Sequence, residues 1–497
     1  FKYNRSFYRI MLSTFAKYNL GDDISNIIEK GRQNFGPSFL SYEIGTYSQS
    51  IGDYNTAMDE FIMHLINEKS YRSVIERKIL LMSDDKEATE IIEKKLLKAS
   101  EIHPSQILNM LSDFYFKQQK YYLSMKIKKD WTTKGNRDFS EWIKFANDLR
   151  NEGQYQHAID AYYFILSYKL NAKLTERALL GLGQTFDDQI ASPKNKYLIP
   201  YFYDNNMFFK NPFQEYSSIS NMYLESSLNL YDSLLVSLKK SPFLSEAYFR
   251  LGEIHYKILQ DFDKSYYLLN KSMNYRSDKK TMLRTINRIS DVLLAIGQTK
   301  EALKFLQRQL ETDPLKGINE KIILIQFLTN TPDTILNNIE LSIQNIGPSD
   351  PSFNDLIELK NIIVKYCSQP IDSLAFKHFQ KSELLIRQKK LGDSVEELEY
   401  LVRNFSESNI IPLAHLRLAI VNFQMTDYDA ALNYALLLEN TEFADKGIIL
   451  TGQIYEMQGL GTEIYLEQYM KILNDFSFSI YHEPIRYHVR KIQKTES

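Results

Sequence analysis

The residues that could carry out chemistry are few and form no recognisable catalytic set. The sequence contains eight histidines but no His-Glu-x-x-His zinc-binding helix, and the spacing of His482 and His488 is not that of an i, i+4 pair on one helical face. Phosphate-binding loops, dinucleotide-binding turns and Gly-x-Ser-x-Gly elbows do not occur in it. The single cysteine, Cys367, excludes an intrachain disulfide and a cysteine-rich zinc site. We therefore expect no enzyme activity, no cofactor and no metal.

Charged residues are the other candidates for chemistry. The run Lys126–Arg137 is basic and contains Trp131, which makes it the best candidate for contact with an anion or a nucleic-acid base. Its place between two predicted hairpins favours a solvated turn instead. The chain has 60 Lys and Arg against 62 Asp and Glu, a formal net charge of −2, which argues against nucleic-acid binding through charge. We expect no nucleic-acid partner.

The composition predicts that helices position these side chains. Apolar residues make up 44% of the chain and charged residues 25%, a globular balance. The 18 glycines are about half the usual share of roughly 7%, which argues against a turn-rich all-β protein. No apolar run approaches the ~20 residues needed to span a bilayer. We predict an all-α fold without a transmembrane segment.

A repeat runs through the chain. Its clearest copies are Gly52-Asp53-Tyr54-x-x-Ala57-x-x-x-Phe61 and Gly153-Gln154-Tyr155-x-x-Ala158-x-x-x-Tyr162, about three periods of ~34 residues apart. The alanine position returns as Ala88, Ser124, Ala302 and Ala430-Ala431. A second signature precedes the first, as Ile44-Gly45, Leu182-Gly183, Leu251-Gly252 and Thr451-Gly452. Small residues at both positions let two helices pack closely, so we predict helical hairpins.

These residues resemble the tetratricopeptide repeat (TPR) family, with its W-x₂-L-G-x₂-Y…A-x₃-F…P pattern. The best copies are Trp142–Ile165 and Ile286–Pro314, within roughly eleven to thirteen units, several of them degenerate. The resemblance implies an α-α superhelix, a TPR-like solenoid of stacked hairpins, with Trp142 in the core. It also implies a scaffold that binds proteins rather than an enzyme.

The repeat spacing predicts four parts of the chain. They are an N-terminal array over 1–189, an aromatic-rich insertion over 190–220, a central array with degenerate repeats over 221–374, and a C-terminal array with a capping helix over 375–497. A loop as long as the insertion is uncommon and tends to be functional. Two hypotheses stay open: the insertion covers the chain's own groove, or it binds a partner. Its candidate contact residues are Tyr201, Phe202, Tyr203, Phe208 and Phe209.

The resemblance also implies which residues line a concave groove, because the first helix of each TPR hairpin faces it. Carried onto this sequence, the groove residues are Asn109, Asp113, Asn147, Arg150, Phe249, Glu253, Tyr256, Arg284, Asn287 and Asp291. The lysine and asparagine pair with which some family members clamp a terminal carboxylate is not complete in any unit. We therefore expect an extended or helical peptide held by backbone hydrogen bonds and a few pockets.

The function that we expect is a non-enzymatic scaffold that binds protein or peptide segments, and the partner and oligomeric state stay open. A glycan- or cell-wall-binding array accessory to an enzyme is the alternative. Joints such as Phe405-Ser406-Glu407-Ser408 resemble those of TPR proteins of the bacterial cell envelope, so we expect a periplasmic or envelope location. The start at Phe1 is compatible with a removed export signal, and a cytoplasmic regulator is the other hypothesis.

Overall fold

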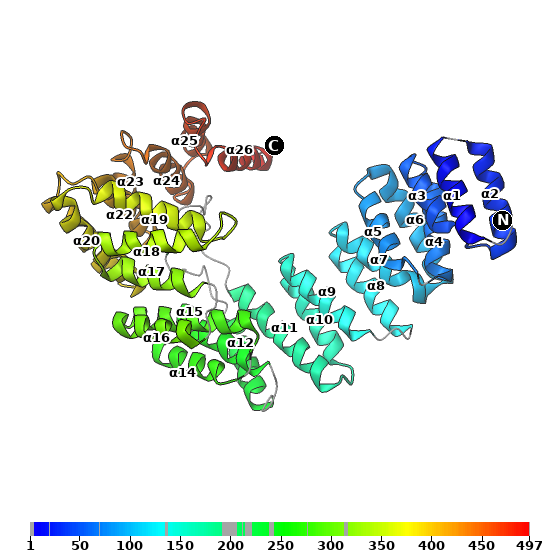
Figure 1. The fold of residues 1–497 in the computed structure, drawn as a ribbon, viewed down its shortest axis with the longest axis horizontal. Helices are drawn as coiled ribbons and strands as arrows, with labels where there is room; N and C mark the ends of the chain where they lie inside the picture. The colour runs from blue at the N-terminus through cyan, green and yellow to red at the C-terminus, as the bar shows by residue number, and fades with distance from the viewer. Residues whose placement is uncertain are drawn as a thin grey trace. The chain divides into compact units, whose positions relative to one another are not determined.

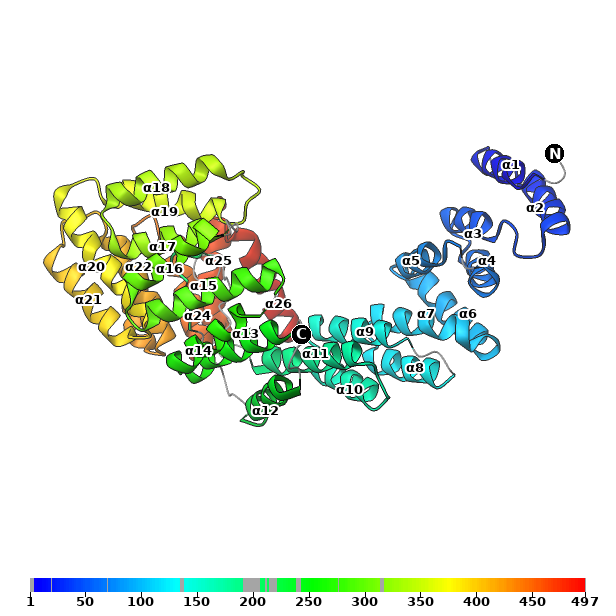
Figure 2. The ribbon, with the colours of Figure 1, turned by 60° about the horizontal axis from the view of Figure 1, so that its bottom comes forward.

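The computed structural model describes most of the chain. The described residues are 4–18, 20–68, 70–134, 138–190, 206–210, 212–213, 221–237, 243–275, 277–312 and 317–496. They fall into two compact units, Phe1–Thr185 and Phe186–Ser497, which we call unit 1 and unit 2. Within each unit, helices that follow one another in the sequence are neighbours in space (Figures 1 and 2).

All regular structure in the described residues is helical. Unit 1 holds α1 Arg5–Lys17, α2 Gly21–Phe35, α3 Ser41–Ser50, α4 Tyr54–Asn67, α5 Arg72–Met82, α6 Lys86–Ile102, α7 Pro104–Lys117, α8 Tyr121–Thr133, α9 Phe139–Asn151 and α10 Tyr155–Leu166. The next helix, α11 Ala172–Ile190, crosses the boundary between the units.

Unit 2 continues the same plan. Its helices are α12 Asn221–Ser237, α13 Leu244–Ile254 with the π-helical turn η1 His255–Leu259, α14 Phe262–Met273, α15 Lys279–Ala295, α16 Thr299–Thr312, α17 Ile318–Thr329, α18 Pro332–Asn345, α19 Phe353–Tyr366, α20 Pro370–Arg387, α21 Leu391–Asn404, α22 Ile411–Gln424, α23 Tyr428–Leu436, α24 Ala444–Met457, α25 Thr462–Asp475 and α26 His482–Glu496.

Consecutive helices pack as hairpins, and each hairpin packs on the next. The pairs α3–α4, α7–α8 and α9–α10 in unit 1, and α13–α14, α20–α21, α22–α23 and α24–α25 in unit 2, make the most extensive contacts. Second helices then contact the first helix of the following hairpin, as α14 contacts α15. The predicted all-α class of stacked helical hairpins is confirmed.

Small residues hold the two helices of a hairpin together, as predicted. A Cβ atom at Gly45 would lie 2.6 Å from the ring of Phe61, and one at Gly452 would lie 2.6 Å from the ring of Tyr469. The alanine position is fully buried in every copy that the sequence identified, namely Ala57, Ala88, Ser124, Ala158, Ala302 and Ala431. Trp142 is also fully buried, which confirms its predicted place in the core.

The turn inside the hairpins needs a left-handed residue. Gly52 has φ +79° and Gly297 has φ +80°, which glycine adopts without steric cost. The degenerate repeats keep the same backbone with a side chain present, at Gln119 (φ 57°), Gln260 (φ 55°), Lys389 (φ 58°) and Thr426 (φ 62°). The turn is therefore kept in repeats that lack the glycine by which the sequence identifies it.

The described part of the irregular region after α16 consists of helices joined by short turns. The predicted helical stretches 320–328 and 353–366 correspond to α17 and α19, and Pro370 begins α20. The predicted capping helix is α26, whose Ile485 and Val489 pack against Tyr469 of α25. The division into three arrays remains a prediction, because the compact units give a single boundary, after Thr185.

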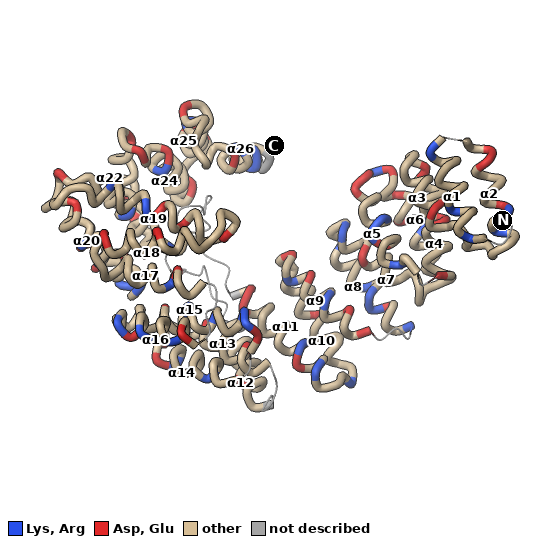
Figure 3. The backbone as a smooth tube through the Cα atoms, in the orientation of Figure 1, with Lys and Arg blue, Asp and Glu red and all other residues tan. Residues whose placement is uncertain are grey.

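Charged residues of both signs are distributed over the helices of both units. Lys and Arg alternate with Asp and Glu along the backbone of both units (Figure 3), in keeping with the net charge of −2. Among the described residues, no helix combines the length and the apolar character needed to cross a bilayer.

Candidate functional site

The predicted groove residues of unit 1 contact other residues of the chain. Asn109 and Asp113 lie on α7, and Nζ of Lys128 on α8 donates to Oδ1 of Asn109 at 2.7 Å and lies 3.9 Å from Oδ1 of Asp113. Burial lowers the pKa of Lys128, which the nearby Asp113 carboxylate partly offsets. On α9, Asn147 accepts a hydrogen bond of 2.7 Å from the hydroxyl of Tyr162.

The basic run that the sequence singled out is not a solvated turn. Its residues 126–133 belong to α8, while 135–137 lie outside the described residues. Lys128 is 2% exposed, and Trp131 is buried with its indole N–H bonded to the carbonyl of Ser105 at 3.2 Å. The run follows helical spacing and contributes its large side chains to the core, so Trp131 presents no face on which a base could stack.

In unit 1 the remaining predicted residue, Arg150, ties two hairpins together. Its guanidinium on α9 donates from Nη1 to the side-chain carbonyl of Gln184 on α11. The four unit 1 residues therefore stabilise the stack of hairpins in this structure. Whether they also bind a partner remains a prediction.

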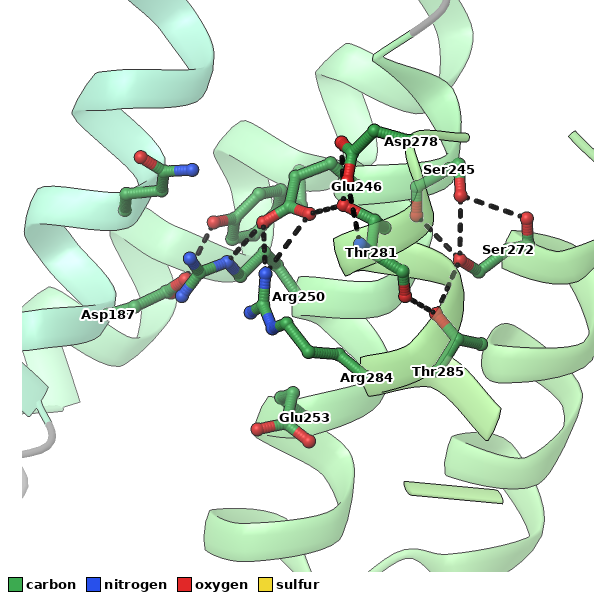
Figure 4. Close-up of polar contacts among 12 residues, drawn as sticks. Asp187, Ser245, Glu246, Arg250, Glu253, Ser272, Asp278, Thr281, Arg284 and Thr285 are labelled. Carbon is green, nitrogen blue, oxygen red and sulfur yellow. Dashed lines mark hydrogen bonds and ion pairs between the residues drawn. The ribbon is translucent and has the colours of Figure 1, made fainter. Parts of the chain in front are cut away.

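The predicted groove residues of unit 2 are brought together on α13, η1 and α15. The Arg284 guanidinium lies 4.1 Å from the centre of the Phe249 ring, and it also reaches Glu246 at 3.3 Å. Figure 4 shows this network, in which Oε1 of Glu246 accepts a hydrogen bond of 2.8 Å from Nε of Arg250 and Oε2 one of 2.9 Å from Thr281. The network locks α13 against α15.

Glu253 and Asp291 are bound by basic residues that the sequence reasoning missed. Arg288 donates to both carboxylates, at 2.9 Å to Oδ2 of Asp291, and Nζ of Lys257 lies 2.9 Å from Oε2 of Glu253. Nζ of Lys321 donates to the other oxygen of Asp291. Burial alone would raise the pKa of Glu253, but Arg288 and Lys257 outweigh it and lower the pKa to about 2.

Tyr256 and Asn287 complete the predicted set. The Tyr256 ring is 1% exposed, with the Arg288 guanidinium 4.6 Å from its centre, and burial raises the pKa of its hydroxyl. Among the described residues, Oδ1 of Asn287 is buried and finds no hydrogen-bond donor. Of the ten predicted groove residues, the structure thus gathers Glu253, Tyr256 and Asp291 around one set of basic side chains.

The described part of the insertion lies in the core of unit 2. Phe208 and Phe209 are 0% and 1% exposed, and both rings lie edge-on to Phe327, with centres 6.3 and 5.8 Å away. Phe213 packs against Tyr256 at 5.2 Å. Tyr201, Phe202 and Tyr203 lie outside the described residues. Residues 206–210 and 212–213, which we call the inserted segment, therefore cover apolar surface of their own unit.

Polar contacts hold the backbone of the inserted segment at both edges. Nη2 of Arg387 donates to the carbonyl of Phe208 at 2.6 Å, and Nη2 of Arg417 to that of Phe209 at 3.2 Å. On the other side, the Met207 amide donates to Oδ2 of Asp355 at 3.0 Å. The side-chain amide of Asn206 donates to Glu358 at 2.6 Å.

A cavity of about 260 Å³ lies beside the inserted segment. The segment, η1 and helices α15, α17 and α20 contribute its walls, which are Met207, Lys210, Pro212, Tyr256, Lys257, Arg288, Asp291, Leu294, Lys321, Leu324 and Arg387. Because η1 is π-helical, the consecutive residues Tyr256 and Lys257 both reach the cavity. We call this the basic cavity, since five of its wall residues are Lys or Arg and one is acidic.

Sequence reasoning missed Arg288 and Lys321 because their partners lie about one repeat away. Glu253 and Arg288 are 35 residues apart, and Glu383 and Arg417 are 34 apart. Opposite charges at about the repeat period, on the first helices of adjacent hairpins, are the signal that would have found them.

Comparisons with known proteins give matches of low sequence identity. No protein-family model matches the chain. The phenylalanine–tRNA ligase beta subunit of Lactococcus lactis subsp. lactis (strain IL1403) is 22% identical over 120 residues, which are 24% of this chain and 14% of that protein.

Three solved structures are similar to the chain. Naa15/Naa10 bound to HypK-THB gives a TM-score of 0.32 and 13% identity, over 92% of this chain and 66% of that one. Yeast Tom70 gives 0.30 and 13%, over 94% and 100%. The TPR domain of P58(IPK) gives 0.21 and 10%, over 92% and 97%. None of the functions of these proteins is transferred to this chain.

Proposed function

We propose that the chain is a non-enzymatic scaffold that binds extended segments of partner proteins on unit 2. The observation that supports this is the binding of the inserted segment there. Arg387 and Arg417 bond its backbone carbonyls, while Phe208 and Phe209 fill apolar space. Peptide recognition commonly works in this way, with main-chain hydrogen bonds providing affinity and side-chain pockets providing specificity.

The contacts between the inserted segment and the surface that holds it do not require the two to be adjacent in the chain. The arginines that donate hydrogen bonds to the carbonyls of the segment lie on α20 and α22, and its aromatic neighbour Phe327 lies on α17. All three helices come more than a hundred residues after the segment. A partner segment with two adjacent aromatic residues could make the same contacts if the inserted segment withdrew. Within the described residues, no group of three or more His, Cys, Asp or Glu side chains is placed to hold a metal ion.

The test is to supply the segment in trans. A labelled peptide with the sequence of residues 206–213 is added to the full chain carrying Phe208→Ser and Phe209→Ser, and fluorescence anisotropy measures binding. We expect saturable binding that Arg387→Ala weakens about tenfold or more, the value of one charge-assisted hydrogen bond. A control peptide with both phenylalanines replaced by serine should bind much more weakly.

Equal binding of the two peptides would contradict the proposal. If the double variant is poorly folded, the peptide should raise its melting temperature, because a ligand that binds only the folded state stabilises it. No such shift would also count against the proposal.

Two further hypotheses stay as predictions. The glycan-binding alternative requires exposed aromatic rings, and the described rings of the insertion, Phe208, Phe209 and Phe213, are buried. It therefore depends on the aromatic residues of the insertion outside the described residues, which include Tyr201, Phe202 and Tyr203. The cell-envelope location depends on the joints between repeats in the sequence.

A further inference from the structure

The basic cavity holds more positive than negative charge. Its walls carry Lys210, Lys257, Arg288, Lys321 and Arg387 against Asp291. The acids behind the walls, Glu253 and Glu383, bring the balance to an excess of two positive charges. Four charges lie further out: Arg417 binds Glu383, Asp355 interacts with Lys210, and Glu358 interacts with Lys446. These two cations and two carboxylates leave the excess unchanged.

Several of these cations have hydrogen-bond donors to spare. An ammonium group has three donors, and the structure shows one acceptor for Lys257 and one for Lys321. Lys210 is exposed at the cavity and has no ion-pair partner within bonding distance among the described residues. Burial lowers the pKa of Lys257, Lys321 and Arg387, and repulsion between neighbouring cations adds to this effect. The surrounding acids therefore do not fully neutralise the positive charge of the cavity.

We propose that the basic cavity binds a compact dianion of the phosphate class, as free phosphate or as the phosphate of a phosphorylated side chain. A phosphate carries a charge of about −1.5 to −2 at pH 7, which matches the excess of two. Its oxygens accept several hydrogen bonds at once, which suits donors that converge from η1, α15, α17 and α20. The volume of about 260 Å³ admits such a group but not an extended chain.

The position of the cavity links this inference to the proposed function. Met207, Lys210 and Pro212 of the inserted segment form part of the wall, so a bound anion would contact both the segment and the surface that holds it. The inference rests on the proposed function only for the phosphorylated-segment source. Binding of free phosphate is independent of it.

The test uses the full chain and inorganic phosphate as the probe. Isothermal titration calorimetry and thermal melting are run in phosphate and in sodium chloride of equal ionic strength. We expect phosphate, but not chloride, to bind and to raise the melting temperature. Lys210→Gln with Lys257→Gln should weaken phosphate binding at least about tenfold, while both glutamines can still donate hydrogen bonds.

The control is Lys304→Gln, which removes one positive charge from an exposed position of unit 2 outside the cavity, with its side chain 65% exposed. It should leave phosphate binding unchanged. The inference is overturned if phosphate acts no differently from chloride, or if Lys304→Gln weakens binding as much as the cavity variants do.

A third arm identifies the source of the phosphate. A peptide with one phosphoserine and its unphosphorylated form are compared with inorganic phosphate as competitors. Tighter binding of the phosphopeptide than of phosphate assigns the site to a modified partner segment, and equal binding assigns it to the free ion. Failure of phosphate binding leaves the trans-peptide experiment above unaffected, so the two proposals fail separately.

Discussion

The guanidinium of Arg417 donates a hydrogen bond of 3.2 Å to the backbone carbonyl of Phe209, 208 residues earlier in the chain. The same guanidinium binds both oxygens of Glu383, at 2.6 and 3.0 Å, and Glu383 is fully buried. One side chain thus joins the inserted segment, α20 and α22.

Arg417→Met should destabilise unit 2 by about 3–5 kcal/mol, because it leaves the buried Glu383 with Arg387 as its remaining partner. Chemical denaturation of the full chain, followed by circular dichroism, measures the loss. Both tryptophans, Trp131 and Trp142, lie in unit 1, so their emission should report a separate and unchanged transition.

The control for this variant is Arg403→Met, whose side chain is 70% exposed and lies 4.0 Å from Glu399. Exposed pairs contribute roughly 0–1 kcal/mol, so little change is expected there. A loss below about 1 kcal/mol for Arg417→Met would contradict the buried ion pair.

Phe209→Ala should cost about 3–5 kcal/mol, as expected for a phenylalanine removed from a packed core. The comparison is Phe478→Ala, since the Phe478 side chain is fully exposed and its truncation should leave stability within about 0.5 kcal/mol. Urea denaturation monitored by circular dichroism gives both values. Similar small effects for the two variants would show that the inserted segment does not belong to the core.

Thr426→Gly should stabilise unit 2 by about 1 kcal/mol. Thr426 has φ 62°, and a left-handed backbone costs a residue with a side chain roughly 1–2 kcal/mol. The reverse change, Gly52→Ala at φ +79°, should destabilise unit 1 by a comparable amount. Thermal melting of both variants checks the opposite signs, and a loss of stability in Thr426→Gly would refute the turn assignment.

Gly45→Ala should destabilise unit 1 by about 1–3 kcal/mol, since its added methyl group would lie 2.6 Å from Phe61. Gly21→Ala is the matched change at a helical position with nothing within 4 Å, and there we expect a small gain from helix propensity. Tryptophan emission during denaturation reports both, because they lie in unit 1.

Asp187→Asn should remove a pH dependence from unit 2. Asp187 accepts hydrogen bonds from Ser227 at 2.7 Å and Tyr231 at 2.6 Å, and burial raises its pKa to about 6. Between pH 4 and 6 the folded protein keeps a proton that the unfolded chain has lost, so this group makes stability fall as pH rises.

The variant lacks this fall, so its stability relative to the parent should increase by about 3 kcal/mol from pH 4 to pH 7, at 1.36 kcal/mol per pKa unit. Denaturation of parent and variant at several pH values and constant ionic strength measures the difference. A difference that does not vary with pH would show that the Asp187 pKa is ordinary.

The helices could be predicted from local signals in the sequence. A glycine at the turn and a small residue such as Ala57 are enough to place a hairpin, because both act on neighbours within it. The signal was weaker where Gln119 or Lys389 takes the turn position, since tertiary packing there maintains a backbone that the residue itself disfavours.

The site could be predicted only in part. Glu253, Tyr256 and Asp291 were found because the repeat places them on the first helix of a hairpin. Arg387 and the inserted segment were not connected, because their contacts join residues about 180 positions apart and follow no repeat. Contacts of that kind produce no periodic pattern in a single sequence.

The wide separation of Phe209 and Arg417 also affects how the chain is made. At about 5–20 residues per second, the ribosome needs roughly 10–40 s to extend the chain from one to the other. Until α22 is made, the set of helices that encloses the aromatic rings of the inserted segment is incomplete, although α17 and α20 are made earlier. Nascent chains of this protein should therefore be clients of ribosome-associated chaperones, and fragments ending before α22 should aggregate.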